Sequence, residues 1–81
     1  MQSLEEMTEE FEQGLNEFVA ETGEAADAVW YDLVSSTAFT LLTVEDFSPE
    51  AVALAREFCR TQTGSIPHDL EPYLGKKDWV Q

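Results

Sequence analysis

The chain has 81 residues, of which 43% are hydrophobic, and it carries a formal net charge of −13 at pH 7. Residues 1–55 contain thirteen carboxylates and no Lys, Arg or His, whereas residues 56–81 carry four acids and four bases. This distribution repels nucleic acid and anionic membranes, so we expect neither to be contacted directly, and we expect a basic or apolar protein surface as partner.

The length and composition predict one small domain without disulfide or metal crosslinks. We expect residues 1–75 to form the domain and residues 76–81 a tail. The single cysteine, Cys59, cannot pair internally, and with one histidine, His68, it cannot complete a zinc site. Because so small a chain buries little surface, we expect it to form a homodimer. The acidic start lacks the basic region of a secretion signal, which favours a cytoplasmic protein.

Residues 3–21 show the pattern of an amphipathic helix. Ser3 and Glu6 form a capping box, and Gly23 is the kind of residue that commonly ends a helix. At the helical period, the apolar residues fall within an arc of about 120°. These residues are Leu4, Met7, Phe11, Leu15, Phe18 and Val19. The opposite half of the helix carries glutamates.

Residues 24–43 are predicted to form a second helix, with a hairpin as the alternative. The apolar surface of this helix would extend round roughly two-thirds of its circumference, so the helix has to be covered on more than one side. A hairpin fits the many β-branched and aromatic residues, but the serine pair at its turn lacks the Gly or Asn that a tight hairpin turn requires. We therefore favour the helix. Trp30 and Tyr31 are expected to lie in the core, with the alternative that they anchor an interface.

A third helix is predicted over residues 49–61. Ser48 is a good N-cap, and a proline occupies the first helical position. The segment beyond has too many prolines and glycines for a long helix, but Leu70, Tyr73 and Leu74 allow one short turn docked on the core. The predicted fold class is all-α, with three helices and a short C-terminal turn.

The acidic face of the first helix is the main candidate site. Between Glu5 and Glu24, eight carboxylates lie along about 29 Å, or one per ~3.6 Å, close to the ~3.4 Å between charges along a DNA strand. Such a face fits a protein that mimics DNA, and it also fits a solvated surface that keeps the protein soluble. The candidate partner-binding residues are Glu5, Glu6, Glu9, Glu10, Glu12 and Glu17, together with Trp79 in the tail.

The arginines of the third helix suggest a contact between copies of the chain. Arg56 and Arg60 lie one turn apart, and we expect them to contact the first-helix glutamates of a second copy in a symmetric dimer. Trp79 is expected to dock either on its own core or on a partner or second copy.

The sequence carries no catalytic or cofactor signature. Exposed carboxylates on one helix share the same solvent environment, whereas acid–base catalysis needs two unlike environments. Small acidic helical proteins of this length include acyl carrier proteins, whose modified serine begins a helix within Asp-Ser-Leu. Here Phe47 separates Asp46 from Ser48, a proline follows, and capping explains the serine. We expect no enzyme activity, cofactor or metal, and keep a carrier role as a remote alternative.

The sequence therefore predicts a non-enzymatic acidic protein-binding module, a small regulator or adaptor. In this hypothesis the glutamates steer a basic partner towards the protein, and an apolar patch is then buried. The alternative is an inhibitor that mimics DNA and occupies a nucleic-acid-binding protein, as phage-type antagonists do. A complex between such a DNA mimic and its target should weaken steeply between ~50 and 200 mM salt.

Overall fold

The computed structural model describes residues 1–75 and shows helices and turns, with no strand among these residues. In chain order the elements are α1 (Leu4–Thr22), α2 (Ala26–Val44), α3 (Pro49–Thr63), the 3₁₀ turn η1 (His68–Leu70) and α4 (Glu71–Leu74). The all-α class, the three helices and the short C-terminal turn are thereby confirmed, and the hairpin alternative for the second segment is excluded. The predicted tail, residues 76–81, lies outside the described residues.

Helices α1 and α3 begin at side-chain caps, and each ends at a glycine. The hydroxyl oxygen of Ser3 accepts a hydrogen bond from the N–H of Glu6 over 3.1 Å, and the N–H of Ser3 donates to the Glu6 carboxylate over 2.9 Å. This reciprocal pair is a capping box that starts α1. At α3, the Ser48 hydroxyl accepts from the N–H of Ala51 over 3.1 Å. Gly23 ends α1 with a φ of 77°, the left-handed conformation that glycine adopts most readily.

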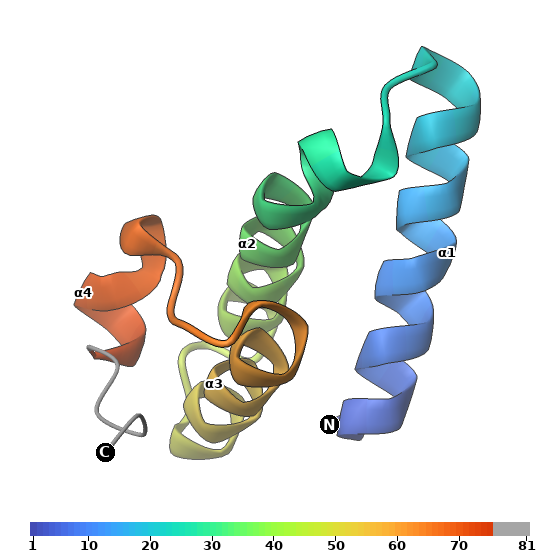
Figure 1. The fold of residues 1–81 in the computed structure, drawn as a ribbon. Coiled ribbons are helices and arrows are strands. Elements are labelled where there is room, and N and C mark those ends of the chain that lie inside the picture. The colour runs from blue at the N-terminus through green and yellow to red at the C-terminus, as the bar shows by residue number, and fades with distance from the viewer. Residues whose placement is uncertain (76–81) are drawn as a thin grey trace.

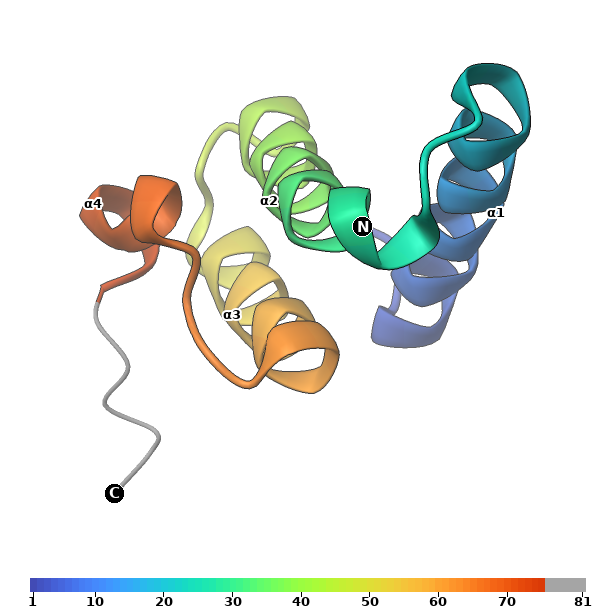
Figure 2. The ribbon, with the colours of Figure 1, turned by 45° about the horizontal axis from the view of Figure 1, so that its top comes forward.

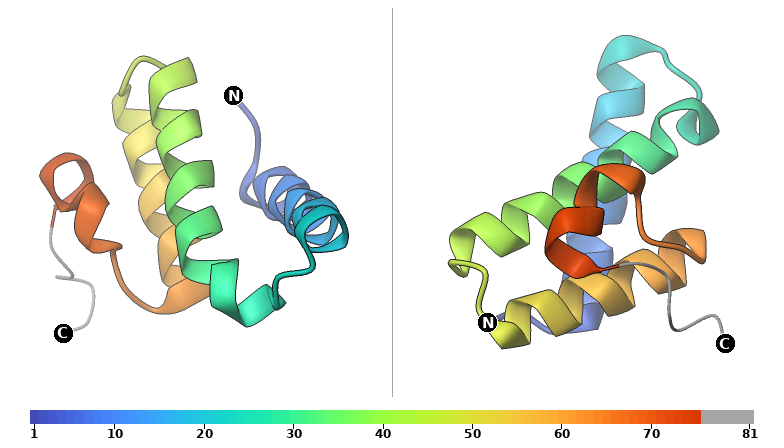
Figure 3. Two further views of the ribbon diagram at one scale, coloured as in Figure 1. Left: turned by 90° about the horizontal axis from the view of Figure 1, so that it is seen from above. Right: turned by 90° about the vertical axis from the view of Figure 1, so that its left-hand side faces the viewer.

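The three long helices and the C-terminal turn are arranged in a simple order. Helices α2 and α3 pack side by side as an antiparallel pair joined by a short turn (Figures 1 and 2). Helix α1 packs against one side of this pair, and η1 and α4 pack against the other. Helix α1 has no contact with η1 or α4, because the pair of α2 and α3 lies between them (Figure 3).

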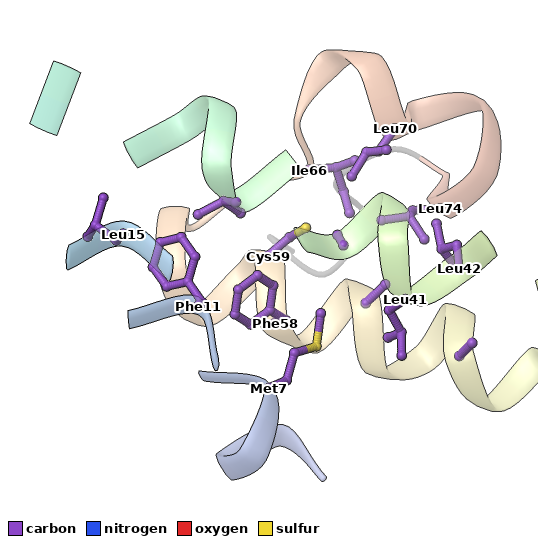
Figure 4. Close-up of a cluster of buried hydrophobic side chains, with 14 residues drawn as sticks. Met7, Phe11, Leu15, Leu41, Leu42, Phe58, Cys59, Ile66, Leu70 and Leu74 are labelled. Carbon is purple, nitrogen blue, oxygen red and sulfur yellow. The ribbon is translucent and has the colours of Figure 1, made fainter. Parts of the chain in front are cut away.

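The core lies where α1 meets the pair of α2 and α3 and extends beneath η1 and α4 (Figure 4). The ring of Phe11 makes edge-to-face contacts with Trp30, at a centroid distance of 5.0 Å, and with Phe58, at 5.5 Å. Edge-to-face pairs at such distances add to the free energy gained by burial. The buried hydrophobic residues are Met7, Phe11, Leu15, Val34, Ala38, Leu41, Leu42, Ala51, Ala55, Phe58, Cys59, Ile66, Leu70 and Leu74.

Two aromatic residues that the sequence assigned to the apolar interior lie at the surface. Phe18, in the apolar arc of α1, is 38% exposed, and Tyr31 is 46% exposed. Trp30 is half-buried, as expected for a residue packed on Phe11. Phe18 lies near the C-terminal end of α1 and Tyr31 in the second turn of α2, so both are close to the turn that joins these helices (Figure 1).

Candidate protein-docking surface

The structure positions the predicted acidic residues of α1 on its exposed side. Within residues 1–75, no ion pair involves a carboxylate of α1. Glu6 also closes the capping box, so its carboxylate has a structural role as well as a charge. Trp79 lies outside the described residues. The predicted partner-binding residues that are exposed are Glu5, Glu6, Glu9, Glu10, Glu12 and Glu17.

The two arginines of α3 already make contacts within their own chain. Arg60 forms an ion pair with Glu57, three residues earlier. The hydrogen bond with Arg60 lowers the pKa of the Glu57 carboxyl, and the same bond raises the pKa of Arg60. Arg56 donates a hydrogen bond from Nη1 to the carbonyl oxygen of Leu74, which joins α3 to α4. The predicted contact of Arg56 and Arg60 with the α1 glutamates of a second copy would add to these bonds or replace them. This contact stays a prediction.

Three aromatic side chains form a cluster on the molecular surface, which we call the aromatic cluster: Phe39, Phe47 and Tyr73. Phe39 comes from α2, Phe47 from the turn between α2 and α3, and Tyr73 from α4. Their exposed fractions are 42%, 40% and 46%. The ring centroids are 6.3 Å apart for Phe39 and Phe47, 5.8 Å for Phe39 and Tyr73, and 5.3 Å for Phe47 and Tyr73. The three rings are therefore in direct contact while each remains open to solvent.

The backbone holds Phe47 in this cluster in an unfavourable conformation. Asp46 and Phe47 have φ angles of 58° and 54°, the left-handed region that bulky residues rarely adopt. This conformation costs roughly 1–2 kcal/mol for a residue other than glycine. It is fixed by the C-terminal turn of α2, where the N–H of Phe47 donates to the carbonyl oxygen of Leu42 over 2.7 Å. A strained and exposed aromatic residue is a feature often found at functional sites.

A hollow of about 400 Å³ opens beside the aromatic cluster, between α2 and the C-terminal turn. We call it the α2–α4 hollow. Two exposed carboxylates border it, Asp32 from α2 and Asp69 from η1. Its lining contains no basic side chain. The lining residues are Asp32, Ser35, Ser36, Phe39, Asp69, Leu70 and Tyr73.

A second hollow, of about 500 Å³, lies on the other side of α2 and faces α1. Glu10 of α1 and Glu45 at the end of α2 border this α1–α2 hollow, together with hydroxyl side chains of α2. Ser36 lines both hollows, so the exposed side of α2 is a ridge between them. The ridge thus has carboxylates on both sides and the aromatic cluster on one side.

Ser48 and Cys59, the two nucleophilic residues that the sequence analysis considered, are engaged in the fold. The Ser48 hydroxyl caps α3. Cys59 is completely buried, and burial raises the pKa of its thiol to about 12, so the thiol holds its proton at neutral pH. Among residues 1–75, no group of three or more His, Cys, Asp or Glu side chains is arranged to hold a metal ion.

The acidic residues could be named from the sequence, whereas the aromatic cluster was missed. The predicted second helix is apolar round most of its circumference, so its pattern does not single out Phe39, and Tyr73 is predicted to belong to a turn docked on the core. The one local signal was Phe47, an aromatic residue in a polar turn between two predicted helices. Only the fold brings these three residues, which are far apart in the sequence, into contact.

Comparison of the chain with protein-family models, with curated proteins and with solved structures finds no match. Within residues 1–75, no helix combines the length and the hydropathy that crossing a bilayer requires. Function has to be inferred from the surface of the molecule, where the exposed carboxylates of α1 and the ridge on α2 are the two unusual features.

Proposed function

We propose that this protein is a non-enzymatic protein-binding module, a small cytoplasmic regulator or adaptor whose partner is basic and has an apolar segment. The observation that carries the proposal is the exposed aromatic cluster on a strongly acidic protein. Exposed aromatic rings in mutual contact offer a large apolar area, and aromatic residues supply much of the binding energy at protein interfaces. Binding would remove this area from water.

The glutamates of α1 would act at an earlier stage, by attracting the partner. At physiological ionic strength the field of a charge extends over about 8 Å, so the exposed carboxylates of α1 speed encounter more than they stabilise the complex. Glu10 is the glutamate best situated for direct contact, because it borders the ridge as well as the acidic face. The other members of the predicted set would serve mainly in steering.

The conformation of Phe47 supports binding at the cluster over a purely structural role. A glycine at this position would adopt the same φ without strain, yet the chain has an aromatic residue there. Its ring is 40% exposed and so gains only part of the free energy that burial in a core would give. A binding function accounts for keeping both the strain and the exposure.

The homodimer that we propose uses a different surface. A symmetric contact through the ridge would bring carboxylates of two copies together, which is unfavourable. The outer face of α3, with Arg56 and Arg60, could instead meet the α1 glutamates of a second copy. Light scattering of wild type and of Arg60→Glu tests this contact, and a dimer that survives the charge reversal contradicts it.

The exposed glutamates also favour a second candidate function, inhibition of a nucleic-acid-binding protein by imitation of DNA. Their charges are not neutralised by ion pairs within residues 1–75. A complex formed in this way should be displaced by duplex DNA and should weaken steeply as salt rises. A complex that depends on the aromatic cluster should resist both treatments.

Affinity capture with matched variants tests the proposed function. Wild type, Phe47→Gly, Tyr73→Ser and the control Tyr31→Ser would each be used to capture partners from the native host, with elution by salt and identification by mass spectrometry. Tyr31 and Tyr73 are both 46% exposed, but only Tyr73 belongs to the aromatic cluster. We expect the partner to bind wild type and Tyr31→Ser only. Equal capture by all four proteins would exclude the cluster as the docking site.

A further inference from the structure

We infer that the α2–α4 hollow is a subsite for an arginine side chain of the partner. This inference rests on the proposed function and names the chemistry of one contact within it. The hollow combines two features that arginine recognition uses, carboxylates that accept hydrogen bonds and aromatic rings that can stack on a flat cation. Its volume of about 400 Å³ is at the small end of the range for ligand pockets, which suits one side chain better than a helix.

The two carboxylates reach the hollow from separate elements. Asp32 belongs to α2 and Asp69 to η1, and the fold brings both to the rim of one hollow. Neither carboxylate is in an ion pair with another residue of 1–75. A guanidinium presents several N–H donors in one plane, which suits a rim that carries two carboxylates, whereas an ammonium is a compact point charge.

The apolar part of the hollow suits the rest of an arginine side chain. Phe39 and Tyr73 form an aromatic wall, and the buried side chain of Leu70 also lines the hollow. Arginine has an apolar stem that packs on such surfaces while its charged end stays hydrated. A cation over the face of an aromatic ring gains about 0.5–1 kcal/mol at exposed sites.

The geometry of the aromatic cluster argues against a quaternary ammonium ligand. An aromatic cage has to leave room for the cation between its rings, because the cation lies within about 6 Å of each centroid. Here the centroids are 5.3–6.3 Å apart, the separation of rings that touch one another. A cation therefore cannot lie between these rings, but it can contact Phe39 and Tyr73 from the hollow that they line.

A second copy of this chain is a poor occupant of the hollow. The arginines within residues 1–75 lie on α3, and in the proposed dimer they face the α1 glutamates of the second copy and not the hollow. A symmetric contact through the hollow would also bring two sets of Asp32 and Asp69 together, and like charges in contact are unfavourable. Charge complementarity thus favours a basic segment of another protein.

Binding of short peptides to the whole protein tests the inference. The probes are a blocked Leu-Ala-Arg-Ala-Leu peptide and two versions in which lysine or citrulline, a neutral analogue of similar shape, replaces the arginine. Binding is followed by the amide signals of the ¹⁵N-labelled protein in NMR titrations. We expect the arginine peptide to shift the signals of Ser35, Ser36 and Leu70, and to bind at least about tenfold more tightly than the others, equal to ~1.4 kcal/mol.

A pair of double variants separates a specific subsite from general charge attraction. Asp32→Asn with Asp69→Asn removes both carboxylates of the hollow. The control Glu21→Gln with Glu24→Gln removes the same charge from two exposed residues outside the predicted partner-binding set. We expect the double variant of the hollow to weaken binding of the arginine peptide at least about tenfold. The control double variant should weaken it less than about twofold at 150 mM salt. Thermal unfolding of each variant confirms that it is folded.

The possible results bear differently on the two proposals. Equal losses from both double variants, equal binding of the lysine or citrulline peptide, or shifts confined to α1 would each overturn the arginine subsite. If the peptide fails in this way while Tyr73→Ser still loses the native partner, the subsite is excluded and the proposed function stands. If Tyr73→Ser keeps the native partner, the proposed function fails whatever the peptide does.

Discussion

The indole N–H of Trp30 donates a hydrogen bond to the carbonyl oxygen of Gln62 over 3.2 Å, which joins α2 to the last turn of α3. Carbonyl groups in the last turn of a helix have no partner within the helix, so Trp30 satisfies one of them. The same indole packs edge-on against Phe11 of α1 at 5.0 Å. One side chain therefore contacts all three long helices.

Replacement of Trp30 should show how much this bond contributes to stability. We expect Trp30→Phe to lower the free energy of unfolding by about 1–2 kcal/mol, because the Gln62 carbonyl loses its donor and some packing is lost. Urea unfolding followed by circular dichroism measures the change. The control Tyr31→Phe alters an exposed neighbour and should stay within about 0.5 kcal/mol of wild type. Equal effects of the two variants would contradict the role of the bond.

Gly14 offers a stabilising substitution. It lies in the interior of α1, is exposed, and a Cβ added to it would meet no atom within 4 Å. Gly14→Ala should therefore raise the free energy of unfolding by about 0.5–1 kcal/mol through helix propensity alone. Gly23→Ala is the opposite case, because Gly23 has a φ of 77° and alanine there is strained. Thermal unfolding should show a higher midpoint for the first variant and a lower one for the second.

Phe47→Gly separates stability from binding. The change relieves roughly 1–2 kcal/mol of backbone strain and loses ring contacts that are each worth about 0.5–1.5 kcal/mol. We expect a free energy of unfolding within about 1 kcal/mol of wild type, measured in urea, together with loss of partner binding. A loss of several kcal/mol would show that Phe47 serves mainly to hold α4 on the fold.

The helix ends could be predicted because their signals are local. The capping box of Ser3 and Glu6, the N-cap Ser48 and the terminal Gly23 each act through neighbours three or four residues away, and each is found in the structure. The buried stripe of α1 was also predictable, because it repeats at the helical period. Phe18 belongs to this stripe but is exposed. The helical period shows on which face of the helix a residue lies, but it does not show how far the neighbouring helices extend along that face.

The surface of α2 could not be predicted for a related reason. This helix is apolar round most of its circumference, so the sequence shows no single buried face. Tyr31 and Phe39 became exposed because α1, α3 and η1 cover the other directions. Contact among Phe39, Phe47 and Tyr73 depends on where the C-terminal turn docks, which is a tertiary property that no local pattern carries.

Cys59 makes stability sensitive to alkaline pH. Burial raises the pKa of its thiol to about 12, above the ~8.5 of a thiol in the unfolded chain. Between these values the unfolded chain releases a proton that the folded protein keeps. Stability therefore falls as pH rises through this window, by up to ~1.4 kcal/mol per pH unit for this group.

The comparison of wild type with Cys59→Ala isolates this contribution. The variant is less stable at pH 7, because a buried side chain is shortened, but its stability should fall less between pH 9 and 11. Urea unfolding at a series of pH values measures both slopes. Reaction of the wild-type thiol with iodoacetamide should also be slow until the protein opens, because both burial and protonation protect it. Equal slopes for the two proteins would show that the thiol ionises normally.

The acidic face of α1 predicts that salt stabilises the free protein. Glu5 with Glu9 and Glu6 with Glu10 lie one turn apart, and each such pair of like charges costs about 0.2–0.5 kcal/mol. Screening of these and neighbouring pairs between about 20 and 200 mM NaCl should recover ~1 kcal/mol, which raises the melting temperature by roughly 4–8 °C. Calorimetry at several salt concentrations measures this rise.

Neutralising one carboxylate should have opposite effects on two helices. Glu9→Gln removes a charge that faces Glu5, so it should raise the melting temperature and reduce its salt dependence. Glu50→Gln removes the acidic residue in the first turn of α3, where a negative charge favours the helix N-terminus, so it should lower the melting temperature. If both variants shift the melting temperature in the same direction, net charge alone governs stability. If the two shifts are opposite, the position of each carboxylate on its helix determines whether it stabilises or destabilises the protein.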